Sequence, residues 1–209
     1  MTLLIFDCDG VLVDSEHLAC AALAEVMTTL GHSMTADEAM RAFAGRSLKD
    51  VLARAERLLS RPIPKDLGEQ AAVQLMARFR RELQAVAGVK EAIAALPYRR
   101  CVASSSDPSR LTLSLDVTGL SALFGNNVFS AVEVANGKPA PDLFLLAARR
   151  LGEDPSSCIV IEDSVPPGPP AWPLLDSRAP ATQIRAWPNV SLPREPNRSS
   201  TQWPIYRRR

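Results

Sequence analysis

Residues Leu3 to Gly10 read Leu-Leu-Ile-Phe-Asp-Cys-Asp-Gly, and this stretch decides the fold. Its apolar half predicts a buried strand of a parallel sheet, because both faces of such a strand are covered. The acids follow at the carboxyl end of the expected strand. Two acids that are two positions apart on an extended chain point to the same side. Asp7 and Asp9 are therefore expected to work together, with one carboxylate attacking while the other handles a proton.

The same two acids also have an ordinary structural reading, in which one caps a helix and the other stabilises a turn. Asp is a competent nucleophile in phosphoryl transfer through an aspartyl phosphate. Gly10 would let the chain turn sharply close to a substrate. A motif of this length does not choose between the two readings, so the choice depends on the rest of the chain.

After this stretch, the sequence predicts a purely helical region and then a region that contains both strands and helices. Over residues 15–85 apolar side chains recur at helical spacing, Thr35 and Glu38 form a capping box, and no strand pattern is present. Pro108 is expected to open a later helix, and another is expected over about Asp142–Leu151. Short apolar runs that predict further strands lie at 101–103, 128–130 and 158–161.

Strands that alternate with helices are typical of a parallel sheet in an α/β protein. We therefore predict a Rossmann-like parallel-sheet core that is interrupted, after its first strand, by a helical insert. The expected core consists of residues 1–14 and 87–165, and the expected insert of residues 15–86. A chain of 209 residues is long enough for both.

The composition changes abruptly after Val165. Residues 166–209 hold ten of the seventeen prolines, all three tryptophans, seven arginines and two acids. Proline at this density blocks helices and interior strands. We predict an irregular, proline-rich tail that is partly packed through Trp172 and Trp187.

Charge and hydropathy exclude several classes of protein. Hydrophobic residues make up 46% and charged residues 22% of the chain, which is ordinary for a globular protein. The net charge of +1 argues against a nucleic-acid or membrane partner. No apolar run approaches the length of a membrane span, and the start lacks the basic flank of a signal peptide. A cytoplasmic location is therefore expected.

The four cysteines form no CxxC pair, so a zinc site or a disulfide framework is not expected. We predict that they are small buried thiols, and they are Cys8, Cys20, Cys101 and Cys158.

Three further loops carry residues suited to phosphate chemistry. Ser104 and Ser105 follow an expected strand, where hydroxyl groups and the amides of a helix N-terminus can hold phosphate oxygens. Lys138 would supply positive charge to a phosphoryl group. Glu162 and Asp163 follow another expected strand, where acids suit a hard cation such as Mg²⁺. Each group also has an ordinary reading, respectively a serine-rich turn, an exposed lysine and a helix cap.

The carboxyl ends of parallel strands meet at one crevice, so these loops are expected to converge. The motifs Phe-Asp-Cys-Asp-Gly, Ala-Ser-Ser-Ser, Gly-Lys-Pro-Ala-Pro-Asp and Val-Ile-Glu-Asp-Ser follow one another in this order. In this set and order the chain resembles the haloacid dehalogenase superfamily, in the branch that contains β-phosphoglucomutase and small sugar-phosphate phosphatases. The resemblance covers about Met1 to Val165.

The resemblance implies a role for each group. Asp7 would be the nucleophile and Asp9 the general acid and base, while Ser104 would bind the transferring phosphoryl group and Lys138 would neutralise it. The Asp7 carboxylate would hold Mg²⁺ together with the backbone carbonyl of Asp9. The remaining ligands of the metal would be Glu162 and Asp163.

The helical insert would be a mobile cap that excludes water from the site. Its hinges would lie near residues 13–16 and 85–89. The segment Gly45-Arg46-Ser47 aligns with a substrate-contacting cap loop, so Gly45 and Arg46 are expected to bind the substrate beside Ser105. An exposed surface arginine is the ordinary reading of Arg46.

Hydrolysis is expected rather than phosphosugar isomerisation. The mutase that this chain resembles uses a cap histidine, and Ala19 stands at that position here. His17 is close in sequence but falls on another side of the helix, and Leu48 stands where a mutase would have an arginine. We expect a phosphatase of small phosphorylated sugars or polyols, with a mutase as the alternative. The enzyme is expected to be a monomer or a weak dimer.

The resemblance stops at Val165, where the family continues with a helix of small residues. Pro166 to Trp172 read Pro-Pro-Gly-Pro-Pro-Ala-Trp. The codons of this segment, read in a shifted frame with G at the free positions, give Ala-Gly-Ala-Ala-Gly followed by Leu, Met or Val. Our hypothesis is that the tail is frameshifted, which would remove a helix and leave a sheet edge uncovered. Two further alternatives are therefore a degenerate, non-catalytic protein and a basic tail that binds an acidic partner.

Overall fold

The computed structural model describes residues 2–44, 48–163 and 174–176. The chain divides into two compact units, one consisting of Met1–Val13 with Ala85–Arg209 and the other of Asp14–Gln84. The two places where the chain passes between the units lie side by side. The Asp14 N–H donates to the Gln84 carbonyl at 3.0 Å, and the Val86 N–H donates to the Leu12 carbonyl at 3.0 Å.

The first unit is built on a parallel sheet with strand order β3-β2-β1-β4-β5. The strands are β1 (Leu3–Phe6), β2 (Arg99–Ser104), β3 (Val128–Ser130), β4 (Cys158–Glu162) and β5 (Leu174–Asp176). Strand β1 lies between β2 and β4, and its Phe6 is in register with Val102 and Ile161. The first strand of the sequence is therefore central in the sheet, as its continuous apolar pattern predicts.

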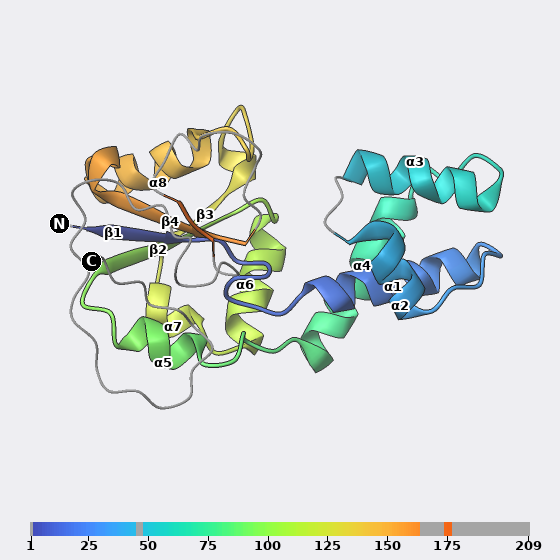
Figure 1. Cartoon of the computed structure of the whole chain (residues 1–209), viewed down its shortest axis with the longest axis horizontal. Coiled ribbons are helices and arrows are strands. Elements are labelled where there is room, and N and C mark those ends of the chain that lie inside the picture. The colour runs from blue at the N-terminus through green and yellow to red at the C-terminus, as the bar shows by residue number, and fades with distance from the viewer. Residues whose placement is uncertain (1, 45–47, 164–173, 177–209) are drawn as a thin grey trace. The chain divides into compact units, whose positions relative to one another are not determined.

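Helices cover both faces of this sheet (Figure 1). The α-helices of the unit are α5 (Val89–Ala94), α6 (Pro108–Val117), α7 (Ser121–Phe124) and α8 (Asp142–Leu151). The described residues of the unit also contain two short 3₁₀ turns, η1 (Ala131–Glu133) and η2 (Pro155–Ser157). Helix α8 lies on one face, and α5, α6 and α7 lie on the other (Figure 1). The predicted α/β class with a parallel-sheet core is confirmed.

The core forms where the apolar faces of strands and helices meet. Leu3 and Ile5 of β1 are fully buried in one cluster with Leu143 and Ala147 of α8, whose spacing places them on one helix face. On another side, the ring of Phe6 meets that of Phe124 edge to face at 5.8 Å. Each large apolar side chain buried in this way contributes about 1.5–3 kcal/mol.

The second unit is helical, with α1 (Glu16–Thr29), α2 (Ala36–Phe43), α3 (Leu48–Leu59) and α4 (Leu67–Glu82). Helix α2 begins with the predicted capping box: the Glu38 N–H donates to the Thr35 hydroxyl at 3.2 Å, and the Thr35 N–H donates to the Glu38 carboxylate at 2.7 Å. Helix α1 packs against α2 and α4. Met27, Ala39 and Leu67 are at the centre of a separate apolar cluster.

The tail differs from the expectation at one place. Residues 174–176 form strand β5, which pairs in parallel with β4 and brings Leu174 into register with Val160. The prediction of an irregular tail that leaves this sheet edge uncovered is wrong for these three residues. The reason is physical: the edge of β4 offers unpaired backbone groups, and Leu-Leu-Asp contains no proline to prevent pairing. Trp172 and Trp187 lie outside the described residues.

The four cysteines are free and buried, as predicted. Burial raises the pKa of the Cys158 thiol to about 11 and that of Cys101 further, so both stay protonated at neutral pH. In the described part of the chain, no helix has both the length and the apolar character that a membrane crossing requires.

Candidate active site

The carboxyl ends of β1, β2 and β4 bring the predicted site residues together. Asp7 directly follows β1 and is buried, and its backbone N–H donates to the Ile161 carbonyl at 2.9 Å. Ser104 ends β2 and Glu162 ends β4, and both are buried. The parallel register alone places these side chains at the same end of the sheet, where the strands end. The spacing in the sequence was therefore sufficient to predict that they converge.

Lys138 is the central cation of the site. Its ammonium group lies 2.9 Å from Asp7 Oδ1 and 2.7 Å from Glu162 Oε2. It comes from the loop between β3 and α8, and its nitrogen also lies 5.2 Å from the centre of the Phe144 ring. A lysine so enclosed is not an ordinary surface lysine, because burying its charge is costly unless acids surround it.

Burial and charge act in opposite directions on these groups. Burial raises the pKa of Asp7 to about 8, with Lys138 lowering it and Glu162 raising it. For Lys138, burial lowers the pKa, but Asp7 and Glu162 together outweigh it and hold the pKa above its ordinary value. The acids therefore favour the charged form of Lys138, whereas burial favours the protonated form of Asp7.

The third acid completes a set that fits a hard cation. One carboxylate oxygen each from Asp7, Glu162 and Asp163 lie within 4.8 Å of one another. Carboxylates this close repel one another when they are ionised, and a divalent cation would offset that repulsion. Oxygen-only ligands suit Mg²⁺, which keeps water and phosphate oxygens as its remaining ligands. The residues present therefore fit a magnesium site.

A glycine is needed at position 10 because the carboxylate of Asp163 lies close to its backbone. The φ of Gly10 is +75°, and a Cβ added to it would collide with the carboxylate of Asp163. Any other residue would both strain the backbone and displace a carboxylate of the cluster. The sequence pattern predicted a glycine that permits a sharp turn, and the structure adds a second reason for it.

Ser104 and its neighbours form the loop that leads into α6. The Ser104 hydroxyl accepts a hydrogen bond from the Ser106 N–H at 3.1 Å, so the loop is folded over the end of β2. Ser105 is exposed. Asp107 caps α6 by accepting from the N–H groups of Ser109 and Arg110, each at 3.0 Å, with Pro108 at the first helical position as predicted.

Two residues that contact Asp9 were not predicted from the sequence. Arg110 Nη2 lies 2.8 Å from Asp9 Oδ1, and the Ser106 hydroxyl donates to Asp9 Oδ2 at 2.7 Å. A signal for Arg110 was available: a cation in the first turn of a helix opposes the helix dipole, so it calls for an acidic neighbour. No comparable signal marks Ser106 among the three consecutive serines.

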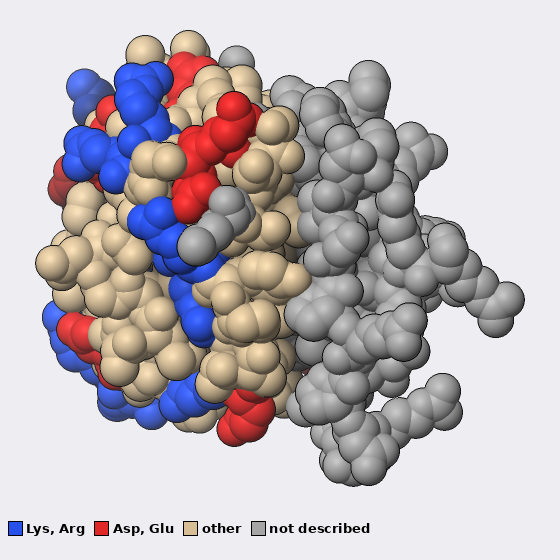
Figure 2. Space-filling view, turned by 90° about the vertical axis from the view of Figure 1, so that its left-hand side faces the viewer, with Lys and Arg blue, Asp and Glu red and all other residues tan. Residues whose placement is uncertain are grey.

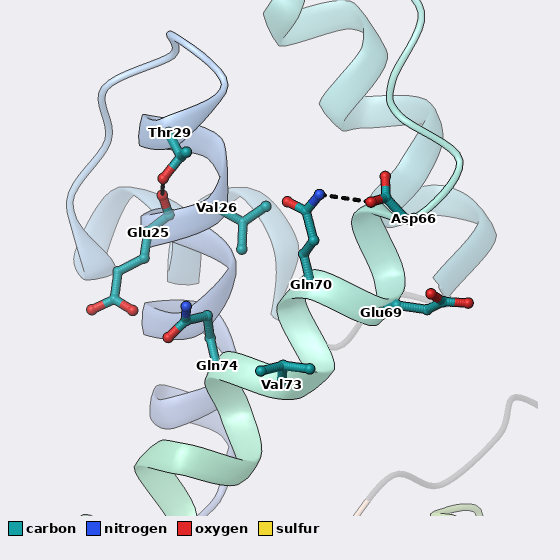
Figure 3. Close-up of a pocket in the computed structure, with 8 residues that line it drawn as sticks. All are labelled: Glu25, Val26, Thr29, Asp66, Glu69, Gln70, Val73 and Gln74. Carbon is teal, nitrogen blue, oxygen red and sulfur yellow. Dashed lines mark hydrogen bonds between the residues drawn. The ribbon is translucent and has the colours of Figure 1, made fainter.

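The predicted substrate residues Gly45 and Arg46 lie outside the described residues, as does Ser47. The helical unit does contain a cavity of about 390 Å³ between α1 and α4 (Figure 3). Its polar lining consists of acids, amides and a threonine, without a basic side chain: Glu25, Thr29, Asp66, Glu69, Gln70 and Gln74. Such a lining would repel a phosphate ester, so this cavity is not a candidate active site.

Charged side chains of both signs lie on the face that Figure 2 shows. On the face in Figure 2, basic side chains form a broken band with acidic side chains beside it. The ion pair between Arg99 Nη1 and Glu153 Oε1, at 2.7 Å, shows how closely the two signs are interspersed in this unit.

A sequence profile of the family described as haloacid dehalogenase-like hydrolase matches residues 1–171. The chain is 27% identical to 6-phosphogluconate phosphatase of Escherichia coli K12, over 77% of this chain and 73% of that protein. It is 30% identical to hexitol phosphatase B of the same bacterium, over 77% and 74%.

Solved structures agree with this similarity. A haloacid dehalogenase-like protein of unknown function from Agrobacterium tumefaciens has a TM-score of 0.69 and 36% identity, over 78% of this chain and 75% of that one. A hydrolase of the same kind from Deinococcus radiodurans, solved with bound phosphate and sodium, has a TM-score of 0.64 and 32% identity, over 78% and 73%.

Proposed function

The chain belongs to the haloacid dehalogenase-like hydrolases, and from this premise we propose that it is a Mg²⁺-dependent phosphatase of a small sugar or polyol phosphate. Its class is that of the phosphoric monoester hydrolases. The observation that carries the proposal is the convergence of Asp7, Glu162, Asp163 and Lys138 on one buried point. A phosphoryl group can be attacked there, neutralised and released.

In the proposed reaction, an Asp7 carboxylate oxygen attacks the phosphorus atom and forms the new P–O bond of an aspartyl phosphate. The bond from phosphorus to the leaving oxygen breaks, and Asp9 gives that oxygen a proton. Water then attacks the phosphorus and transfers its proton to Asp9, which releases inorganic phosphate and restores the Asp7 carboxylate. Lys138 stabilises the negative charge of the transferring group throughout.

The metal ion would be held by Asp7, Glu162 and Asp163, with the backbone carbonyl of Asp9 as a further ligand. When bound, it supplies the positive charge that keeps Asp7 ionised and that offsets the charge of the phosphoryl oxygens. This need is supported by the burial of Asp7, which otherwise favours the protonated and non-nucleophilic form.

Ser104 and the amides at the start of α6 would hold the phosphoryl oxygens, with Ser105 beside them. A helix N-terminus suits an anion because its first N–H groups point outward. The helical unit would serve as the cap, and Gly45 and Arg46 would contact the part of the substrate that leaves. The paired backbone bonds at residues 12–14 and 84–86 support hinges at the two connections.

The substrate class rests on the relatives. One is a phosphatase of a phosphorylated sugar acid and another of phosphorylated hexitols. A polyhydroxy substrate would be held outside the phosphate site by hydrogen bonds to the cap. The mutase alternative has less support, because Ala19 stands where the cap histidine of a mutase is expected. The exposed His17 lies instead 3.5 Å from the Asp14 carboxylate.

The test is phosphate release from a panel of hexose, pentose and polyol phosphates, measured with Mg²⁺ and with a chelator. We expect release only with Mg²⁺, and none from Asp7→Asn. Isomerisation of glucose phosphates without phosphate release would favour the mutase. A chain that binds inorganic phosphate but hydrolyses neither the panel nor p-nitrophenyl phosphate would favour a degenerate protein.

A further inference from the structure

The carboxylate of Asp9 is held at both of its oxygens by residues of one segment. Arg110 Nη2 lies 2.8 Å from Oδ1, and the Ser106 hydroxyl lies 2.7 Å from Oδ2. Both partners belong to the loop and first turn of α6, whereas Asp9 follows β1. The contact thus joins two segments that are about one hundred positions apart in the sequence, and both are in the same compact unit.

The segment that carries these two partners is itself held in place. The Ser106 N–H donates to the Ser104 hydroxyl, and the Ser106 carbonyl accepts from the Ser130 hydroxyl at 2.6 Å. The Arg110 N–H donates to the Asp107 cap. Arg110 and Ser106 therefore present their side chains from a fixed backbone, which is what an orienting contact requires.

We propose that Arg110 and Ser106 are positioning residues that hold the Asp9 carboxylate toward the leaving oxygen, with Arg110 anchoring Oδ1 and leaving Oδ2 to exchange the proton. This inference rests on the proposed function. An Asp side chain in a loop otherwise samples several rotamers. Fixing one of them removes an orientational cost from each proton transfer.

The geometry is compatible with both proton transfers. When Oδ2 carries the proton, Oδ1 is a carbonyl oxygen that still accepts from Arg110, and Oδ2 keeps a lone pair that can still accept from the Ser106 hydroxyl. When Oδ2 is ionised, it accepts from Ser106 or from the attacking water. The side chains of Arg110 and Asp9 are 25% and 31% exposed, so water can reach the carboxylate.

The test compares two substrates whose leaving groups differ in their need for a proton from Asp9. A residue that acts through Asp9 should matter only for the substrate whose leaving group needs that proton. The leaving group of sorbitol 6-phosphate is an alkoxide that needs a proton, whereas that of p-nitrophenyl phosphate is a stable phenolate that does not. We expect Arg110→Met to slow the first step, the transfer of the phosphoryl group to Asp7, by about 10- to 100-fold with sorbitol 6-phosphate. This loss is a part of the rate enhancement of about 10²–10⁴-fold that a general acid contributes. The first step on p-nitrophenyl phosphate should change less than about threefold.

A double-mutant cycle makes the inference specific to Asp9. Because Arg110 acts through Asp9, the variant that combines Asp9→Asn with Arg110→Met should be no slower than Asp9→Asn alone. Additive losses would overturn the inference, since they would mean that Arg110 acts on the substrate itself. Equal losses on both substrates would overturn it too, since they would indicate a merely structural role.

Ser106→Ala keeps the backbone contacts of the loop and removes only the hydroxyl bond to Asp9, so it provides a second route if Arg110→Met fails to fold. It should show the same dependence on the leaving group, and Arg110→Lys should recover part of the rate. Arg149→Met is a matched control at an exposed site in the last turn of α8 and should leave both rates unchanged. A wild-type chain that is inactive on p-nitrophenyl phosphate and on the whole panel of sugar and polyol phosphates would overturn the proposed function and this inference with it.

Discussion

At the scale of single residues, the burial of Asp7 makes metal binding depend on pH. Burial raises the pKa of this carboxyl to about 8, so below that pH the metal-free site holds a proton that a cation must displace. We predict that the affinity for Mg²⁺ rises about tenfold per pH unit below pH 8 and levels off above it. Calorimetric titrations in buffers of different ionisation enthalpy would show one proton released per ion. An affinity that is constant from about pH 6 to 8 would contradict this.

Gly10 permits a sharper test of the metal cluster. Gly10→Ala strains a residue with φ +75° and also drives a methyl group into the Asp163 carboxylate. We predict a loss of unfolding free energy of about 1–2 kcal/mol from the backbone, together with a large loss of Mg²⁺ affinity.

Gly152→Ala is the matched control for this change. Its φ is +68°, but no atom lies within 4 Å of the added Cβ. The control should lose stability like Gly10→Ala and keep its metal affinity. Equal Mg²⁺ affinities in the two variants, from titration of the metal, would count against the assigned cluster.

The residues that the sequence predicted and those that it missed differ in one respect. Asp7 and Glu162 stand at the carboxyl ends of apolar strands and Lys138 stands in a motif, and the fold brings them together. Arg110 and Ser106 contact Asp9 from a segment that is distant in the sequence. The place of Arg110 in the first turn of α6 indicates an acidic neighbour, but no local pattern identifies Asp9 as that neighbour. Side chains that act through another side chain are for this reason the hardest to find from sequence.

At the scale of elements, the cap of α6 controls the turn that carries Arg110. Asp107 accepts from the N–H groups of Ser109 and Arg110. We predict that Asp107→Ala lowers the unfolding free energy by about 0.5–2 kcal/mol. It should also slow the first step on sorbitol 6-phosphate more than that on p-nitrophenyl phosphate, because Arg110 loses its fixed backbone.

The chain contains a natural control for this prediction. Asp154-Pro155-Ser156 repeats the sequence Asp107-Pro108-Ser109, and Asp154 likewise accepts from the N–H of the serine two residues later. Asp154→Ala removes the same kind of cap from η2, away from Asp9. If this variant impaired turnover of the two substrates as Asp107→Ala does, the effect would be one of stability and not of positioning.

The elements themselves were predictable to different degrees. The helices were found because their signals are local: Thr35 and Glu38 form the capping box of α2, and Pro108 opens α6. Strand β5 was missed because nothing in its three residues distinguishes it, and prolines surround it. It pairs because β4 offers a free edge, which is a property of the assembled sheet.

At the scale of the whole molecule, the sequence after Val165 departs from the pattern of the family. The family profile ends at residue 171, close to the point at which the prolines begin. We propose that the residues after Val165 are read in a shifted frame, which in the other frame encodes a helix of small residues. A chain with that frame restored should have a higher free energy of unfolding, because it gains an element that buries apolar area against the sheet.

Denaturant unfolding of the two chains, both with the same residues 1–165, measures this difference. The DNA of the locus provides an independent check, since the other frame should continue without a stop codon. A stop codon there, or a restored chain of equal or lower stability, would contradict the proposal.

The measurement that tests the central claim most directly is the trapping of the phosphoenzyme. The chain is mixed with Mg²⁺ and sorbitol 6-phosphate, quenched in acid within milliseconds, digested and examined by mass spectrometry. The account predicts a phosphoryl group on Asp7, absent without Mg²⁺ and absent from Asp7→Asn. Phosphate release without any phosphoryl group on Asp7, or turnover that survives Asp7→Asn, would contradict it.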